Sequence, residues 1–372
     1  MNIYRSSSIL RLIAFFIVAI MLVCTFGFTV DGWSFKGKYD DTATNQKNDN
    51  QISNESDIIN TDAIISSPNT EPEIYIPEYV NALTGLETTK ALSAKRPIAV
   101  VMSSDNASYA TSYADILAEL PIEDGSTRFV AFITDTKDMG KIGSIAPSRN
   151  YISNLAFYLN AISISYGNDD SISYSACDIS QSRFDLTNSS GYHYSEYTNY
   201  QYSNADLLNA GIKNLGITTS STKSLLPYLF NDFGNDNTKG VIKAENIKIA
   251  FSDSSLTEFN FNRETGKYTL SKNGEEKIDR LNGNDLLFKN CLVLFADSVT
   301  YEGVNGSQMV MNTIGSGSGF YFTEGTVASI FWCADEENGL KIIDESGDLL
   351  IVNRGNTYIG FVKSSKIQSV TF

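Results

Sequence analysis

The sequence predicts an α+β protein in which an N-terminal domain of mixed α/β layers is followed by a mostly antiparallel β domain. In the first half, short apolar runs typical of buried strands alternate with stretches of helical spacing, which favours a layered α/β or α+β architecture. In the second half, strand-like runs are separated by turn sequences such as NRETG and SKNGE, without helical periodicity. We therefore place the two domains at residues 77–243 and 244–372.

The N-terminal segment predicts a membrane attachment rather than a folded domain. Residues 1–8 are interpreted as a cytoplasmic stub and residues 9–30 as a transmembrane signal anchor or signal peptide, because no charged residue occurs in 12–30. With a rise of 1.5 Å per residue, that uncharged stretch would form a helix of about 28 Å, enough to cross a hydrocarbon core. Arg11 precedes the stretch and Asp31 follows it, so we expect a single-pass cell-membrane protein whose bulk is extracytoplasmic.

Three processing routes fit this segment. An uncleaved signal anchor is the first interpretation, because no small-x-small cleavage pattern stands out, and a cleaved signal peptide is the second. The third is lipidation of Cys24, although Val23 occupies the position where a lipobox has a small residue. Residues 31–76 are rich in Asp, Asn, Ser and Thr, which predicts a disordered linker that tethers the folded part.

Charge and residue counts argue against several functions. A net charge of −15 argues against a nucleic-acid partner and against a polybasic membrane patch, since both need clustered Lys and Arg. No two of the four cysteines have C-x-x-C spacing, and His193 is the single histidine. We therefore expect no zinc or multi-histidine metal site, no histidine triad and no cofactor. Cys291 and Cys333 lie in strand-like runs, where they either pair across a sheet or stay buried as free thiols.

Apolar β-rich runs and helical spacing predict the elements of the N-terminal domain. Residues 114–120 form a strand or a short helix that Pro121 ends. Further strands are expected at 98–102, 128–134 and 161–165. Helices are expected at 147–159, capped by Ser148, at 203–213, capped by Ser203 or Asn204, and at 222–230.

The C-terminal domain is expected to consist of strands joined by turns. GSGSG at 315–319 precedes a strand instead of a helix, so we interpret it as a hairpin or bulge and not as a phosphate-binding loop. The acidic loops 231–237 and 344–348 lack the spacing of an EF-hand, and we interpret both as turns. The expected strands are 246–251, 258–262, 267–272, 292–296, 308–313, 319–323, 326–332, 340–343 and 358–362.

The turns between the first strands carry charged side chains that suggest a site. Asp115, Glu119 and Glu123 are candidate catalytic residues, because two carboxylates about 5–9.5 Å apart with separated pKa values can hydrolyse a glycosidic bond. Arg128 and Arg149 are candidate ligand-binding residues that would position an anionic group. In the alternative interpretation, one of the glutamates pairs with an arginine and only organises the turns around the sheet.

The tyrosine-rich stretch YHYSEYTNYQY at 192–202 is a second candidate surface. Tyrosine offers a large contact area at a small loss of side-chain entropy, so the stretch suits recognition of a protein or a glycan. In the alternative interpretation, these rings pack onto the N-terminal domain.

Several of these runs, taken together in their order and spacing, resemble the YerB-like lipoprotein family, which is built on domain of unknown function 3048 with its N- and C-terminal parts. The similarity covers most of residues 81–362. It is carried by LTG (83–85), RPIAV (96–100), ADI (114–116), Glu119, Glu123, Gly125, TRF (127–129), KIG (141–143), Ser148–Arg149, Tyr151, Tyr166–Gly167, GSGSGFYFTEGTVASIFW (315–332), Asp344–Gly347 and GNTYIGFV (355–362).

The chain departs from the family pattern at the candidate site. The resemblance implies two arginines before Tyr151, but the first of these positions is Ala146. It also implies a histidine where Tyr166 stands, and a later His-Asn pair whose nearest counterpart is 197–199. If the family has a histidine-dependent activity, we expect this chain to have lost it. The resemblance implies an envelope-associated, membrane-tethered protein of undefined biochemistry.

The sequence thus leads to two hypotheses of different classes. The first is a non-enzymatic, membrane-tethered binding or scaffolding protein of the bacterial cell envelope, attached through residues 12–30, with an envelope protein or cell-wall glycan as partner. The second is a wall-acting hydrolase that uses the three candidate carboxylates. The hypotheses differ in whether two of these carboxylates face one open groove without arginine partners. The expected ligand contacts are Glu119, Arg128, Arg149, Tyr151 and Tyr166.

Overall fold

The computed structural model describes residues 75–372 except 105–107, 168–181, 197–199, 222–225, 239 and 304–305. The described residues belong to one compact unit. The predicted membrane segment, Cys24 and nearly all of the predicted linker lie outside the described residues. Within the described part, no helix has both the length and the apolar character that a membrane crossing requires.

The structure is mostly β with a few short helices, which agrees broadly with the predicted α+β class. A larger sheet contains strands from both halves of the chain. Its order is β10 (Ile242–Lys243), β20 (Thr326–Asp335), β19 (Gly315–Thr323), β16 (Asn290–Ala296), β23 (Thr357–Lys363), β2 (Ile116–Pro121), β3 (Thr127–Ile133), β1 (Ile98–Ser103), β4 (Lys141–Ile145), β8 (Gln201–Asn204) and β7 (Tyr194–Ser195). Off this path, β21 (Gly339–Ile343) pairs with β20, and β5 (Ile162–Ser165) pairs with β1 and β6 (Arg183–Asp185).

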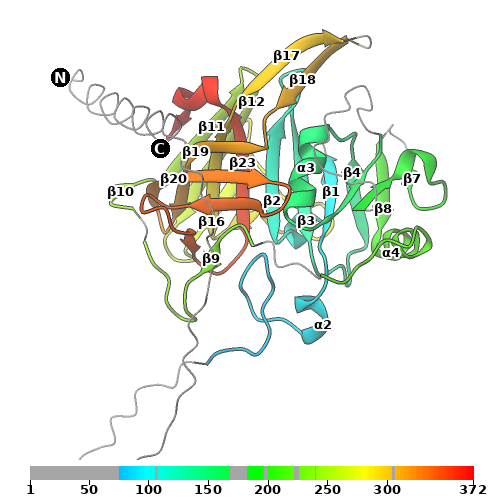
Figure 1. Ribbon diagram of the computed structural model, residues 1–372, viewed down its shortest axis with the longest axis horizontal. Coiled ribbons are helices and arrows are strands. Elements are labelled where there is room, and N and C mark those ends of the chain that lie inside the picture. Colours follow the sequence, from blue (N-terminus) through cyan, green and yellow to red (C-terminus); the bar gives the residue numbers. More distant parts are fainter. Residues whose placement is uncertain are drawn as a thin grey trace, which may run out of the picture. The chain divides into compact units, whose positions relative to one another are not determined.

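A second sheet is formed by strands of the C-terminal half alone. Its order is β14 (Glu275–Glu276), β13 (Lys267–Lys272), β12 (Ser255–Asn262), β11 (Asn246–Ser252) and β24 (Val370–Thr371), with β15 (Leu287–Phe288) beside β13. Two pairs of strands stand apart: β9 (Leu229–Phe230) with β22 (Ile351–Val352), and β17 (Ser298–Gly303) with β18 (Gly306–Met311). The β17–β18 ribbon extends away from the sheets (Figure 1).

The two halves of the chain meet inside the larger sheet. Strand β2 of the first half runs parallel to β23 of the second, with Ile116 opposite Thr357 and Glu119 opposite Gly360. Both strands are buried along almost their whole length, as expected where a sheet is covered on both faces. Strands of both predicted domains therefore share one sheet, and the boundary between 243 and 244 stays a prediction.

Each face of the larger sheet packs against a different layer. Along β1, Val100 and Met102 belong to a core cluster that includes Phe259 of the second sheet. The alternate residue Val101 belongs to a cluster on the other face, together with Ile152 of helix α3 (Asn150–Tyr158). This alternation follows the two-residue period of a strand, and Figure 1 shows α3 against the first-half strands.

The helices follow the prediction in two of three places. Helix α3 lies within the predicted range, but its N-cap is Arg149 and not Ser148, and no side chain caps it. Helix α4 (Ala205–Asn214) is capped by Asn204, whose side chain accepts a hydrogen bond from Leu207 N. The third prediction, 222–230, falls partly on residues outside the description, and it is wrong at its end, where β9 forms. The other helices of the described residues are α2 (Lys90–Ser93), η1 (Thr111–Tyr113), η3 (Leu186–Asn188) and η4 (Ser364–Ser369).

The glycine-rich run 315–319 is part of strand β19, so its interpretation as a hairpin or bulge is wrong. A Cβ on Gly317 would lie 2.3 Å from Phe295 O and 2.6 Å from Trp332 Nε1. The indole Nε1–H of Trp332 donates to Phe295 O at 3.0 Å across this gap. Glycine is needed here because the strand passes close to a backbone and an aromatic ring.

The loop 344–348 is a turn, as predicted. Asp344 Oδ1 accepts hydrogen bonds from Ser346 N at 2.9 Å and Asp348 N at 3.2 Å, so its carboxylate closes the turn. Among the described residues, no group of three His, Cys, Asp or Glu side chains could hold a metal ion.

Cys291 and Cys333 are free thiols. They lie on β16 and β20, which are separated by β19, and Cys291 is fully buried whereas Cys333 is partly exposed. Burial raises the pKa of both thiols and thus lowers their thiolate fraction. In a Cys24→Ser/Cys177→Ser variant at pH 8, we expect a thiol reagent to modify Cys333 slowly and Cys291 only after unfolding. Equal rates for both thiols in the folded protein would contradict this arrangement.

Candidate functional site

Glu119 lies in the core and not in an open site. Its side chain on β2 is fully buried and forms an ion pair with Lys272 of β13, whose side chain is 1% exposed. Three hydroxyl groups donate to the same carboxylate: Thr127 at 2.6 Å, Thr257 at 2.8 Å and Tyr358 at 2.7 Å. The carboxylate is therefore satisfied on both oxygens by residues of both sheets.

Glu123 pairs with Arg149, as the alternative interpretation proposed. Arg149 Nε donates to Glu123 Oε2 at 2.9 Å, and Arg149 Nη2 donates to Oε1 of the same carboxylate. Both side chains are mostly buried, at 13% and 18% exposure. This bidentate pair fixes the turn after β2 to the start of α3.

Asp115 also has its partners within the fold. One carboxylate oxygen accepts from Thr134 N at 2.8 Å, and the other accepts from Asn81 Nδ2 at 3.0 Å. Burial raises the pKa of Asp115, and the hydrogen bonds from Thr134 and Asn81 oppose that effect. The side chain ties the segment before β2 to the end of β3 and to the N-terminal turn.

The three candidate carboxylates thus each have partners within the fold. Glu119 faces a lysine in the core, Glu123 faces an arginine, and Asp115 is bound by a backbone amide and an amide side chain. A general acid or nucleophile must reach the substrate, and the fully buried Glu119 cannot do so in this arrangement. A catalytic role of Asp115 or Glu123 stays a prediction.

Arg128 lies close enough to Glu123, Arg149 and Tyr151 for their charges to act on it, so these predicted contacts are grouped near the turn after β2. Arg128 Nη1 donates to Thr127 O at 3.3 Å, and its buried Nε has no hydrogen-bond partner among the described residues. Ligand binding by Arg128 stays a prediction. Tyr151 is buried with its hydroxyl donating to Pro121 O at 2.8 Å, whereas Tyr166 makes an edge contact with His193, with ring centroids 5.1 Å apart.

The described tyrosines of 192–202 largely pack against the fold. Tyr202 is buried, and its ring lies 3.8 Å from the Lys141 amine. Lys141 also contacts the Tyr109 ring at 4.2 Å and pairs with Glu196 at 2.5 Å. These cation–π contacts use the rings to hold a lysine of the same chain, so they are not open to a ligand.

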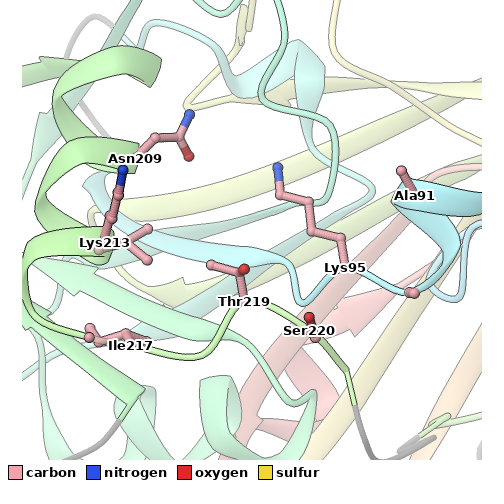
Figure 2. Close-up of a pocket in the computed structure, with 10 residues that line it drawn as sticks. Ala91, Lys95, Asn209, Lys213, Ile217, Thr219 and Ser220 are labelled. Atoms are coloured by element: carbon pink, nitrogen blue, oxygen red, sulfur yellow. The ribbon is translucent and has the colours of Figure 1, made fainter.

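A pocket of about 620 Å³ lies between α2 and the C-terminal end of α4. Lys95 and Lys213 enter it from opposite sides, and Thr219 lies between them in the view of Figure 2. Lys95 is half-buried, and Lys213 is exposed on the last turn of α4. The lining residues are Ala91, Ala94, Lys95, Asn209, Ile212, Lys213, Gly216, Ile217, Thr219 and Ser220.

Arg96 fixes the wall of this pocket. Its guanidinium donates to Thr218 O at 2.9 Å and to Asn160 O at 3.0 Å, and its backbone N–H donates to Thr219 O at 2.8 Å. Next to it, Lys95 and Ser220 form an antiparallel β-bridge. The segment that carries Thr219 and Ser220 is thus held against the start of β1 before any ligand binds.

The pocket is positively charged. Its lining contains two lysine amines and no carboxylate. Burial lowers the pKa of Lys95, while the charge of nearby Asp135 opposes this. The Lys95 amine donates to Thr136 Oγ1 at 3.3 Å, a neutral acceptor. Together with the Thr219 and Ser220 hydroxyls and the Asn209 amide, this arrangement suits binding of an anionic, polar molecule.

Sequence reasoning missed this pocket and the partner of Glu119. The only local signal for the pocket was Lys95 and Arg96, two adjacent charges directly before a buried strand. Nothing in the spacing connects Lys95 to Lys213. The hydrogen bond between Lys272 and Glu119 joins residues 153 positions apart, a separation that no local pattern reports.

The comparisons with known proteins agree with this fold. The DUF3048 N-terminal domain, described as a protein of unknown function, matches residues 83–218, and the DUF3048 C-terminal domain matches residues 247–359. The "Putative lipoprotein YerB" of Bacillus subtilis (strain 168) is 23% identical over 305 residues, which cover 78% of this chain and 88% of that protein. The crystal structure of YerB protein from Bacillus subtilis has a TM-score of 0.67 at 21% identity, covering 79% of this chain and 99% of that one.

The two family matches lie on either side of the predicted boundary at 243. They correspond to two parts of a sequence family, which the larger sheet joins into one compact unit. The likeness to the solved structure concerns the fold, and it includes nearly all of that chain. This chain belongs to the DUF3048 family of proteins of unknown function, whose N- and C-terminal domains it carries in order.

Proposed function

We propose that this protein is a non-catalytic binding protein of the bacterial cell envelope, and that its ligand binds in the pocket between α2 and α4. The observation that carries the proposal is the pocket lining, with two lysine amines, polar hydroxyl and amide groups and no carboxylate. The side chains that suggested catalysis have partners inside the fold instead.

Two features support an extracytoplasmic location. A relative that aligns with 78% of this chain carries the name "Putative lipoprotein YerB", and lipoproteins are attached to membranes by a lipid. In this chain, residues 12–30 are uncharged and follow Arg11, the pattern of an anchor or signal segment. Whether the attachment is a helix or a lipid on Cys24, the compact unit is then held at the outer face of the membrane.

The location makes cell-wall fragments available as ligands. Wall peptides end in carboxylates, whose negative charge is opposite to that of the two pocket lysines. A neutral glycan has no charge with which to bind these lysines. The pocket volume of about 620 Å³ accommodates a small molecule or one unit of a polymer. A wall peptide is therefore a better match than the flat surface of a large envelope protein.

The proposal is tested with the full-length chain in detergent micelles. Muropeptides from digested cell wall are titrated into the protein by calorimetry, and the recovered muropeptides are analysed by mass spectrometry. We expect saturable binding with muropeptides recovered unchanged. Absence of binding, together with no protein partner in an envelope cross-linking pull-down, contradicts the binding function, and cleaved muropeptides contradict its non-catalytic character.

A further inference from the structure

We infer that the pocket between α2 and α4 recognises its ligand through an anionic group, a carboxylate or phosphate, held by Lys95 and Lys213. This inference rests on the proposed function and names the chemical class of its ligand. The two lysines belong to segments far apart in the chain, one after α2 and one in the last turn of α4. The fold brings both to one cavity, where Figure 2 shows them on opposite sides.

The positive charge of the pocket is not neutralised from within. Neither Lys95 nor Lys213 forms an ion pair with a described carboxylate, and none of the residues that line the cavity is acidic. Asp135 attracts the Lys95 amine electrostatically without a hydrogen bond to it, because the hydrogen-bond partner of the amine is the Thr136 hydroxyl. In a chain of net charge −15, such a pocket attracts anions that the rest of the surface repels.

Lys95 is the stronger anchor of the two. Lys95 is half-buried, so water screens an interaction with a bound anion less than at an exposed lysine. Lys213 is exposed and contributes a more screened attraction at the rim. The hydroxyls of Thr219 and Ser220 lie on the wall that Arg96 fixes, where they can donate to the remaining oxygens of the anion.

A discrete ligand fits these observations better than a membrane surface. Binding to anionic lipids uses clusters of about 4–8 Lys and Arg beside the membrane. Here two lysines line a concave site of about 620 Å³, a size typical of small-molecule pockets. We therefore assign the pocket to a soluble anionic molecule or to a single anionic unit of a wall fragment.

The test compares a disaccharide-peptide muropeptide with free carboxylates and the same compound with its carboxylates amidated, titrated into the full-length chain by calorimetry. We expect the charged compound to bind more tightly and its affinity to fall with salt. Lys213→Gln and Lys95→Gln are each expected to weaken binding by about 3- to 10-fold, as for partly exposed charge pairs. Lys95→Arg retains the charge and should retain most of the affinity. Lys267→Gln, at an exposed position on β13, serves as the matched control.

The outcomes separate this inference from the proposed function. Equal binding of both compounds, insensitive to Lys95→Gln and Lys213→Gln, overturns the anion inference while the binding function stands. Binding of inorganic pyrophosphate alone, weakened by both substitutions, supports the anion site and contradicts a wall ligand. Lysine-dependent binding to vesicles of anionic phospholipid, with no muropeptide bound, overturns the assignment to a soluble ligand. Lys213 is exposed, so a loss at Lys213→Gln does not arise from misfolding.

Discussion

Lys272→Met is expected to lower the free energy of unfolding by about 3–5 kcal/mol, because it leaves Glu119 buried without its cation. The lysine amine also donates to Ser255 at 2.8 Å and Thr127 at 2.9 Å, and those hydroxyls lose a partner as well. The measurement is equilibrium denaturation of the full-length chain, followed by tryptophan fluorescence and circular dichroism.

The control is Lys267→Met, at the exposed end of the same strand β13, which should change stability by no more than about 0.5 kcal/mol. Glu119→Leu/Lys272→Met removes both charges, and we expect it to recover part of the loss because no buried charge remains unpaired. A Lys272→Met variant as stable as the wild type would contradict the buried ion pair.

Asp279→Ala is the second substitution for which we expect a large loss, about 2–4 kcal/mol, because several donors lose one acceptor together. Asp279 is fully buried. Its carboxylate accepts from Ala110 N at 2.9 Å, Ser112 N at 2.9 Å and Leu281 N at 2.8 Å. Two of these donors belong to the first half of the chain, so the aspartate joins the halves at the start of η1.

The matched control for Asp279→Ala is Asp285→Ala, in the same loop but exposed. We expect a small change there and, for Asp279→Ala, a single cooperative transition that shifts as a whole. If Asp279→Ala produced a separate early transition of residues 244–372 with the first half still folded, the halves would behave as independent domains, and the single compact unit would be contradicted.

The sequence predicts the longer strands of the second half well, because most of them are bounded by Gly, Asn or Asp at a turn. The predicted strand 267–272 has the observed bounds of β13, and the NRETG turn before it ends β12. Several two-residue strands, and strands with mostly exposed side chains, were not predicted. Strand β17 alternates polar and apolar side chains over Ser298–Glu302, but most of its residues are exposed, so the pattern marks no buried face.

The candidate site was less accessible to prediction because it depends on pairing between distant segments. The pairing of Glu123 with Arg149 was foreseen as an alternative, since both charges lie in turns of one layer. The burial of Glu119 was not, because β2 reads as a strand with one acidic residue, and only its pairing with β3 and β23 places that residue against Lys272. The pocket likewise exists only after the segment 217–221 is bound by Arg96.

The most direct test of the account is hydrogen–deuterium exchange of the full-length chain with and without a saturating concentration of muropeptides. The binding function and the pocket assignment together predict slower exchange in peptides spanning 90–96 and 209–221, the segments that form the pocket. Peptides around Glu123 and Arg149 should exchange at unchanged rates, because that pair is part of the fold. Protection centred on 123–128 and 149, with none at the pocket, would place the ligand at the charged turns and contradict the account.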